Sequence, residues 1–242
     1  MADSKGKKLT LYVDVISPFG YMAYWLTRHS PAFTSIPTTY IPILLGGLMS
    51  QTKNSPPLTI TNKREWIETE RLRTSKSLQI PMMQTFPEKF PVPTTNVQRL
   101  LCYLYLKQQE QEQSNGKEKQ KKKENFIKSL DAFFQACWVQ GKTSEINTEV
   151  VIEEILHSIF ENDGAKVREI LQGMNSEAAK TKLRENTNEA FRSGAFGLPW
   201  FVAENATTGE REGFWGVDSV GKVLECLGVE VQGEGGRYKT ML

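Results

Sequence analysis

The sequence predicts an α/β fold in which a long helical segment interrupts a small sheet. Near the N-terminus, two apolar stretches rich in β-branched residues flank one stretch with helical spacing, which is typical of a β-α-β unit. Near the C-terminus, two strand-like stretches precede a helix-like one. Between these parts, residues 46–194 show helical periodicity in one segment after another. A chain of 242 residues that is 39% apolar can build one sizeable core.

The first strand, within residues 9–16, leads directly into a helix. It ends at Ser17-Pro18, and serine is a favoured N-cap while proline suits the first helical position. The Ser17 hydroxyl is thereby delivered to the positive end of a helix, where free N–H groups stabilise an anion. An ordinary helix cap is the structural alternative. Residues 38–45 predict a second strand, parallel to the first because the helix is the crossover.

The interrupting segment is predicted to be entirely helical after a break at Gly46-Gly47. One polar stretch inside it, residues 107–124, predicts a solvated helix extension or a flexible loop, with a basic contact patch as the functional alternative. The helices predicted from apolar periodicity span residues 64–79, 94–105, 124–139, 148–160, 165–171 and 176–193.

The C-terminal part predicts a strand opening at Pro199, a short strand over 213–216 and a helix over 217–227. Together, β-α-β and β-β-α form the thioredoxin-like plan, in which a proline starting the third strand faces the N-terminus of the first helix. We therefore expect a cis Leu198–Pro199 bond. The predicted domains are a split thioredoxin-like domain (9–45 and 195–228), an inserted helical domain (46–194) and two tails (1–8 and 229–242).

Composition argues against several classes of function. A net charge of +2 gives no reason to expect nucleic acid, and no apolar run approaches the roughly 20 residues that span a membrane. The cysteines form no C-x-x-C motif, and two histidines make a metal site unexpected. Without a recognisable secretory signal, we expect a cytoplasmic protein, although the sequence leaves mitochondria and peroxisomes open.

A series of motifs in fixed order resembles one family. The chain is similar to the kappa-class glutathione transferases and to the related 2-hydroxychromene-2-carboxylate isomerases, both of which belong with DsbA-type thioredoxin-like proteins. The likeness extends from Leu9 to Leu227. The motifs are Ser17-Pro18-Phe19, Gly47-Leu48-Met49, Asn54-Ser55-Pro56-Pro57, Lys63, Ile80-Pro81, residues 194–199 (GAFGLP) and Phe214-Trp215-Gly216-Val217-Asp218.

The resemblance implies that the chain binds glutathione as a co-substrate. Ser17 would donate its hydroxyl hydrogen to the glutathione sulfur and favour the thiolate, which is the nucleophilic form. Ser17 and Gly20 stand where dithiol oxidoreductases carry their cysteine pair. The resemblance places these residues around glutathione: Ser17, Pro18, Phe19, Asn54, Lys63, Leu198, Pro199, Val217 and Asp218.

The remaining roles are also implied by position. The backbone of Leu198 would contact the cysteinyl part of glutathione. Asp218, with the N–H groups of Val217 and Asp218, would hold the γ-glutamyl end, while Asn54 and Lys63 would approach the glycyl end. Without the resemblance, each of these residues has an ordinary structural reading as a turn, a first-turn acid or a solvated lysine.

The predicted function is a kappa-type glutathione transferase that acts on an electrophile or a hydroperoxide, the latter being a peroxidase (oxidoreductase) reaction. A glutathione-dependent isomerase and a non-catalytic glutathione-binding protein are the alternatives. The resemblance implies a homodimer. We also expect no metal, and an apolar pocket for a small electrophile between Phe19, Tyr21 and the helical insertion. Val217 and Ser219 depart from the kappa pattern, which commonly has a small hydroxyl residue before the aspartate and often an arginine after it.

Overall fold

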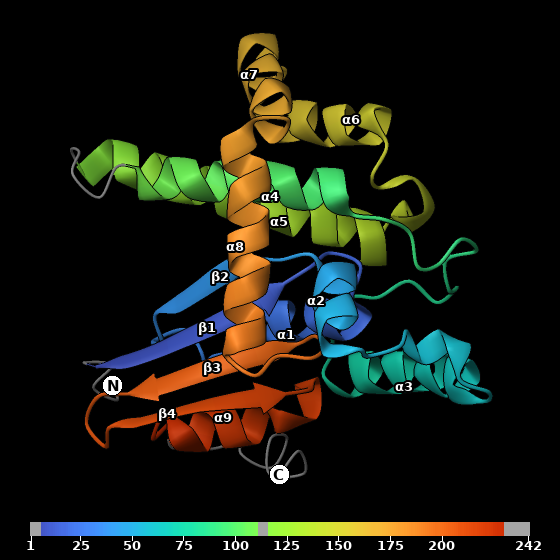
Figure 1. Cartoon of the computed structure of the whole chain (residues 1–242), viewed down its shortest axis with the longest axis vertical. Helices are drawn as coiled ribbons and strands as arrows, with labels where there is room; N and C mark the ends of the chain where they lie inside the picture. The colour runs from blue at the N-terminus through green and yellow to red at the C-terminus, as the bar shows by residue number, and fades with distance from the viewer. Residues whose placement is uncertain (1–5, 111–115, 230–242) are drawn as a thin grey trace.

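A computed structural model describes residues 6–110 and 116–229 of the chain (Figure 1). Its sheet has four strands in the order β2-β1-β3-β4. β2 pairs in parallel with β1, and β3 pairs antiparallel with both β1 and β4. The predicted β-α-β and β-β-α units are therefore confirmed and share one sheet. The strands are β1 (Lys7–Val13), β2 (Thr38–Pro42), β3 (Trp200–Asn205) and β4 (Glu210–Trp215).

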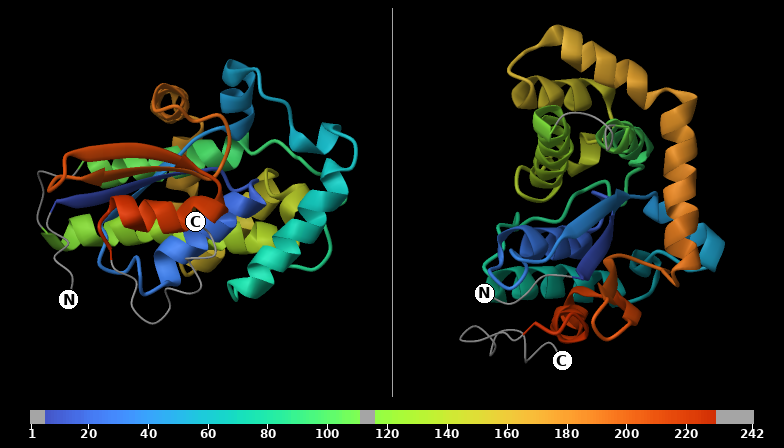
Figure 2. Two further views of the ribbon diagram at one scale, coloured as in Figure 1. Left: turned by 90° about the horizontal axis from the view of Figure 1, so that it is seen from below. Right: turned by 90° about the vertical axis from the view of Figure 1, so that its left-hand side faces the viewer.

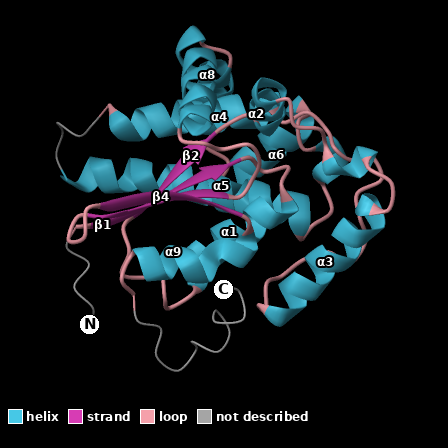
Figure 3. Cartoon of the chain, turned by 60° about the horizontal axis from the view of Figure 1, so that its bottom comes forward, coloured by secondary structure: helices cyan, strands magenta, loops and turns pink. Residues whose placement is uncertain are grey.

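Helices cover both faces of this sheet. α1 (Pro18–His29) and α9 (Val220–Cys226) lie on one face, and α8 (Glu177–Arg192) crosses the other (Figures 2 and 3). Each helix turns apolar residues toward the strands, so that one continuous core fills both layers. At one end of the sheet β1 ends beside the start of β3, and the chain leads from there into α1.

The helical segment runs between β2 and β3, as predicted. α2 lies near the end of the sheet toward which β1 runs, while α4 and α5 cross the molecule side by side (Figure 1). Its helices are α2 (Leu45–Thr52), α3 (Lys63–Ser77), α4 (Thr95–Gln109), α5 (Gly116–Trp138), α6 (Glu149–Ile159), α7 (Gly164–Met174) and α8. Short 3₁₀ turns are η1 (Pro57–Thr59), η2 (Thr143–Glu145) and η3 (Val217–Ser219).

The start of this segment differs from the prediction. β2 ends at Pro42, and Gly46-Gly47 lies inside α2 instead of breaking the pattern. Glycine is a poor helix former. Here the first N–H groups bind partners distant in sequence: Leu44 donates to Thr187 Oγ1 at 3.1 Å and Leu45 to Asp14 Oδ2 at 2.8 Å. Tertiary contacts that the local sequence does not show therefore place the helix start.

The polar stretch 107–124 is helical where the structure describes it, because α4 continues to Gln109 and α5 starts at Gly116. Residues 111–115, most of the N-terminal tail (1–5) and most of the C-terminal tail (230–242) lie outside the described residues. The division into a split sheet domain and an inserted helical domain is our proposal. Within the described ranges, no helix has both the length and the apolar character to cross a bilayer.

Candidate functional site

The turn between β1 and α1 presents Ser17 as predicted. The Ser17 N–H donates to the Asp14 main-chain oxygen at 3.1 Å, which closes a tight turn. Ser17 is the N-cap of α1, and its Oγ accepts a hydrogen bond from Gly20 N–H at 3.0 Å. Pro18 occupies the first helical position. The cap that the sequence indicates is therefore confirmed.

The Ser17 hydroxyl is hydrogen-bonded through its oxygen alone among the described residues. Its oxygen accepts from Gly20, but within the described part of the chain its hydrogen has no acceptor. Ser17 is 5% exposed, so the hydroxyl is almost buried. A Cβ atom at Gly20 would lie 2.9 Å from Ser17 Cβ, closer than real Cβ contacts allow. Glycine at position 20 thus leaves room for the serine.

The proline that opens β3 is joined to the turn before α9. Leu198–Pro199 is a cis bond, as expected, and the Pro199 oxygen accepts a hydrogen bond from Gly216 N–H at 3.1 Å. Gly216 has φ 93° and ψ 150°, a conformation that is essentially restricted to glycine. The turn that follows packs against α1 and carries buried Val217 and exposed Asp218. Ser17, Pro199 and Asp218 therefore belong to three stretches at one edge of the sheet.

Asn54 is the candidate from the helical segment that joins this edge. Its Nδ2 donates to the main-chain oxygen of Phe196 at 2.8 Å, within the loop that leads to Leu198–Pro199. The Phe196 ring packs on Trp215 with centroids 5.0 Å apart. Lys63 begins α3, and among the described residues its exposed side chain has no hydrogen bond or ion pair to the other candidates. The structure thus connects Asn54 to the site and leaves Lys63 unconnected.

The predicted electrophile pocket needs a correction. Phe19 is half-buried against the core, but Tyr21 is 3% exposed, packs on Phe134 and donates its hydroxyl to Pro81 O at 2.9 Å. Its position on the first turns of α1 suggested a wall, whereas the segment after α3 covers it. Tyr21 is a core residue and does not line an open cavity.

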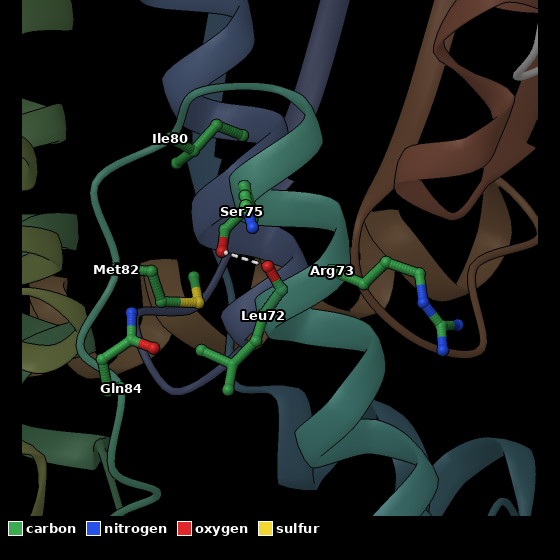
Figure 4. Close-up of a pocket in the computed structure, with 7 residues that line it drawn as sticks. Leu72, Arg73, Ser75, Ile80, Met82 and Gln84 are labelled. Carbon is green, nitrogen blue, oxygen red and sulfur yellow. Dashed lines mark hydrogen bonds between the residues drawn. The ribbon is translucent and has the colours of Figure 1, made fainter.

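A pocket of about 370 Å³ lies between α3 and the segment that follows it. Figure 4 shows Leu72 and Ser75 of α3 facing Met82 and Gln84, while Arg73 points away. Ser75 Oγ donates to Leu72 O at 3.1 Å, so its hydroxyl is already bonded within the helix. The lining includes none of the residues that the resemblance places around glutathione.

Asp14 is the residue at this site that sequence analysis missed. It is fully buried, and its carboxylate accepts four hydrogen bonds: from Ile16 N (3.2 Å), Leu45 N (2.8 Å), Thr94 Oγ1 (2.8 Å) and Gln98 Nε2 (3.0 Å). Burial raises the pKa of Asp14 to about 6, and the donors limit that rise. One signal was available in the sequence, since Asp14 interrupts an apolar run and an acid that is fully buried is almost always paired.

We expect Asp14 to make stability depend on pH. Its pKa is raised in the fold from 3.8 to about 6, so the native state holds a proton there that the unfolded chain has lost. The resulting stabilisation is complete below pH about 4 and disappears as pH rises through about 6, a change of about 2–3 kcal/mol. Urea unfolding at pH 4, 5, 6 and 7 measures the free energy of unfolding of the wild type and of Asp14→Asn. The wild-type value minus the variant value should fall as pH rises, and a difference independent of pH would contradict the prediction.

The cysteines do not provide a nucleophile. Burial raises the pKa of Cys102, Cys137 and Cys226, which keeps all three as thiols at neutral pH. In the portions of the chain that the structure describes, no three His, Cys, Asp or Glu side chains are grouped so that they could hold a metal ion.

Comparisons with known proteins agree with this architecture. Glutathione S-transferase kappa 1 of Rattus norvegicus is 25% identical over 231 residues, which cover 93% of this chain and 92% of the relative. Glutathione S-transferase kappa 1 of Caenorhabditis elegans is 26% identical, with coverage of 91% and 90%. A 2-hydroxychromene-2-carboxylate isomerase structure aligns with a TM-score of 0.65 at 18% identity, covering 91% of this chain and 94% of that one.

A probable DsbA oxidoreductase from Streptomyces coelicolor has the same fold, with a TM-score of 0.59 at 16% identity over 91% of this chain and 88% of that one. The sequence model of the DSBA-like thioredoxin domain matches residues 8–228. This match includes the sheet, the inserted helices and α9. The chain therefore belongs to the DSBA-like thioredoxin domain family.

Proposed function

We propose that this protein is a kappa-type glutathione transferase in which Ser17 stabilises the glutathione thiolate. Relatives named glutathione S-transferase kappa 1 align over nine-tenths of the chain at about 25% identity. The observation that carries the proposal is the Ser17 hydroxyl, which caps α1 through its oxygen and has no acceptor for its hydrogen within residues 6–110 and 116–229. A serine is sufficient because the reactive sulfur arrives with the tripeptide.

The serine and the helix act on the same sulfur charge. The hydroxyl donates a hydrogen bond to the thiolate, and the N-terminus of α1 contributes its dipole; both lower the pKa of the bound thiol. The thiol proton leaves to solvent. The sulfur electron pair then forms a bond to an electrophilic carbon while the leaving group departs with its own bonding pair. With a hydroperoxide, the sulfur attacks oxygen and the O–O bond breaks, giving an alcohol and an oxidised sulfur that a second glutathione reduces.

The rest of the tripeptide would lie along the same edge of the sheet. The backbone of Leu198 would pair with the cysteinyl part, and Asp218 with the first N–H groups of η3 would take the γ-glutamyl ammonium and carboxylate. Asn54 Nδ2 is bonded to Phe196 O, so Asn54 would use its Oδ1 to accept the peptide N–H of the glycyl residue. Ser219 donates its hydroxyl to Trp215 O at 2.7 Å, so this departure from the kappa pattern adds no free hydroxyl there.

The product of a reaction with glutathione tests the proposal. The protein is mixed with millimolar glutathione and an activated aryl chloride, and the products are analysed by mass spectrometry. We expect a glutathione adduct and release of chloride, with no adduct from S-methylglutathione, which lacks the thiol. No heat of binding at millimolar glutathione would refute the proposal, whereas binding without turnover would favour the glutathione-binding alternative.

The isomerase alternative is separated by mass. With a conjugated ketone as substrate, isomerisation leaves the substrate mass unchanged and consumes no glutathione, whereas transfer adds the tripeptide. We also propose that the protein acts as a homodimer. Sedimentation velocity is the direct measurement, and a species of monomer mass at micromolar concentration would contradict the dimer.

A further inference from the structure

We propose that Asp14 is a positioning residue that holds Ser17 and the Asn54 side of the site in one fixed arrangement. The inference rests on the proposed function, because the position of Ser17 matters only if its hydroxyl meets a ligand. Asp14 is fully buried, and its carboxylate is the shared acceptor for groups from three separate parts of the chain.

The first part is the turn that presents the serine. The Asp14 main-chain oxygen accepts Ser17 N–H at 3.1 Å, and its Oδ1 accepts Ile16 N–H at 3.2 Å. Main chain and side chain of one residue thus fix the same four-residue turn, which pairs a β-turn with an Asx turn. Rotation of this carboxylate would release the N–H of the Val15–Ile16 peptide, one residue before Ser17.

The second part is α2. Asp14 Oδ2 accepts Leu45 N–H, the first N–H of this helix, at 2.8 Å. Leu44, the residue before it, has no side-chain cap bond, so the carboxylate serves as the cap from a distance. α2 leads to Asn54, whose side chain bonds Phe196 O in the loop before Leu198–Pro199. Asp14 therefore links the serine turn to the segment that reaches the proline loop.

The third part is the start of α4. Thr94 Oγ1 lies 2.8 Å from Asp14 Oδ1 and 3.1 Å from Oδ2, and Gln98 Nε2 lies 3.0 Å from Oδ1. These donors fix the orientation of the Asp14 carboxylate from the side of α4. An asparagine at position 14 has almost the same shape, but its NH₂ group must face at least one of the N–H or O–H donors. The isosteric change therefore breaks the arrangement without leaving a cavity.

A double-mutant cycle distinguishes positioning from general stability. The cycle compares kcat/KM for glutathione conjugation in wild type, Ser17→Ala, Asp14→Asn and the double variant. If Asp14 acts through Ser17, Asp14→Asn lowers kcat/KM by about tenfold when Ser17 is present and by less than about twofold in the Ser17→Ala background. Equal losses in both backgrounds, or no loss in either, would overturn the inference. If Ser17→Ala alone changes nothing, the proposed role of the serine fails instead.

A milder pair of variants covers the case in which Asp14→Asn does not fold. Thr94→Val removes only the α4 hydroxyl donor to Asp14, from a side chain that is 2% exposed. Thr27→Val is the control, since Thr27 is 6% exposed and its hydroxyl, toward the far end of α1, donates to Tyr24 O and accepts from the Tyr40 hydroxyl. We expect Thr94→Val to lower kcat/KM about threefold and to couple with Ser17→Ala, and Thr27→Val to leave kcat/KM unchanged. The same kcat/KM for both threonine variants would overturn the inference.

Discussion

Replacing Ser17 with alanine is expected to slow glutathione conjugation by about 10- to 100-fold at neutral pH. A hydrogen bond to a charged group contributes about 1.5–3 kcal/mol, which corresponds to one to two pKa units of the bound thiol. The Ser17 hydroxyl caps α1, and the residue is 5% exposed. Thiolate absorbance of bound glutathione, followed against pH in the ultraviolet, measures the shift directly.

The same substitution also removes a helix cap, and this effect needs its own control. Ser176→Ala deletes an N-cap of the same kind at α8, where the serine accepts a hydrogen bond from Ala179 N–H at 3.2 Å. Both variants should lose about 1 kcal/mol of stability through the cap. Only Ser17→Ala should raise the thiolate pKa. Equal thiolate pKa values in both variants would remove Ser17 from the mechanism, whatever happens to stability.

The serine could be predicted from sequence because its signal is local. Strand, Ser, Pro and an apolar helical stripe follow one another, and the cap bond from Gly20 to Ser17 spans only three residues. The same holds for the order of the remaining helices, whose ends mostly lie within a few residues of their predicted positions. The spacing of apolar residues distinguishes a helix from a strand, and it is regular in these segments.

Asp14 could not be predicted in the same way. Its donors come from positions 16, 45, 94 and 98, and three of them are distant in sequence. Nothing in the apolar strand around it indicates those partners. The prediction for the start of α2 was wrong for the same reason, because distant acceptors determine where that helix begins. For Tyr21, helical spacing predicted its place on α1 correctly. It could not predict that the segment after α3 covers this side chain.

Replacing Gly216 with alanine is expected to disrupt the turn that would hold the γ-glutamyl end of glutathione. At φ 93° and ψ 150°, an added Cβ would overlap the Asp218 carboxylate. The Asp218 carboxylate must then move, and the strained backbone weakens the bond from Gly216 N–H to Pro199 O. Backbone strain of this kind costs about 1–3 kcal/mol, and misplacing Asp218 should raise the KM for glutathione about tenfold.

Gly209→Ala is the control that separates the effect of backbone strain from the effect of displacing Asp218. Gly209 also has a positive φ, 75°, but an added Cβ there meets nothing within 4 Å, and the residue lies in the turn between β3 and β4 at the other end of the strands. Both variants should lower the melting temperature, while only Gly216→Ala should weaken glutathione binding in calorimetry. If both weaken binding equally, the loss follows from general destabilisation. If neither does, the γ-glutamyl end is held elsewhere, because a turn rebuilt around Asp218 could not keep the same contacts.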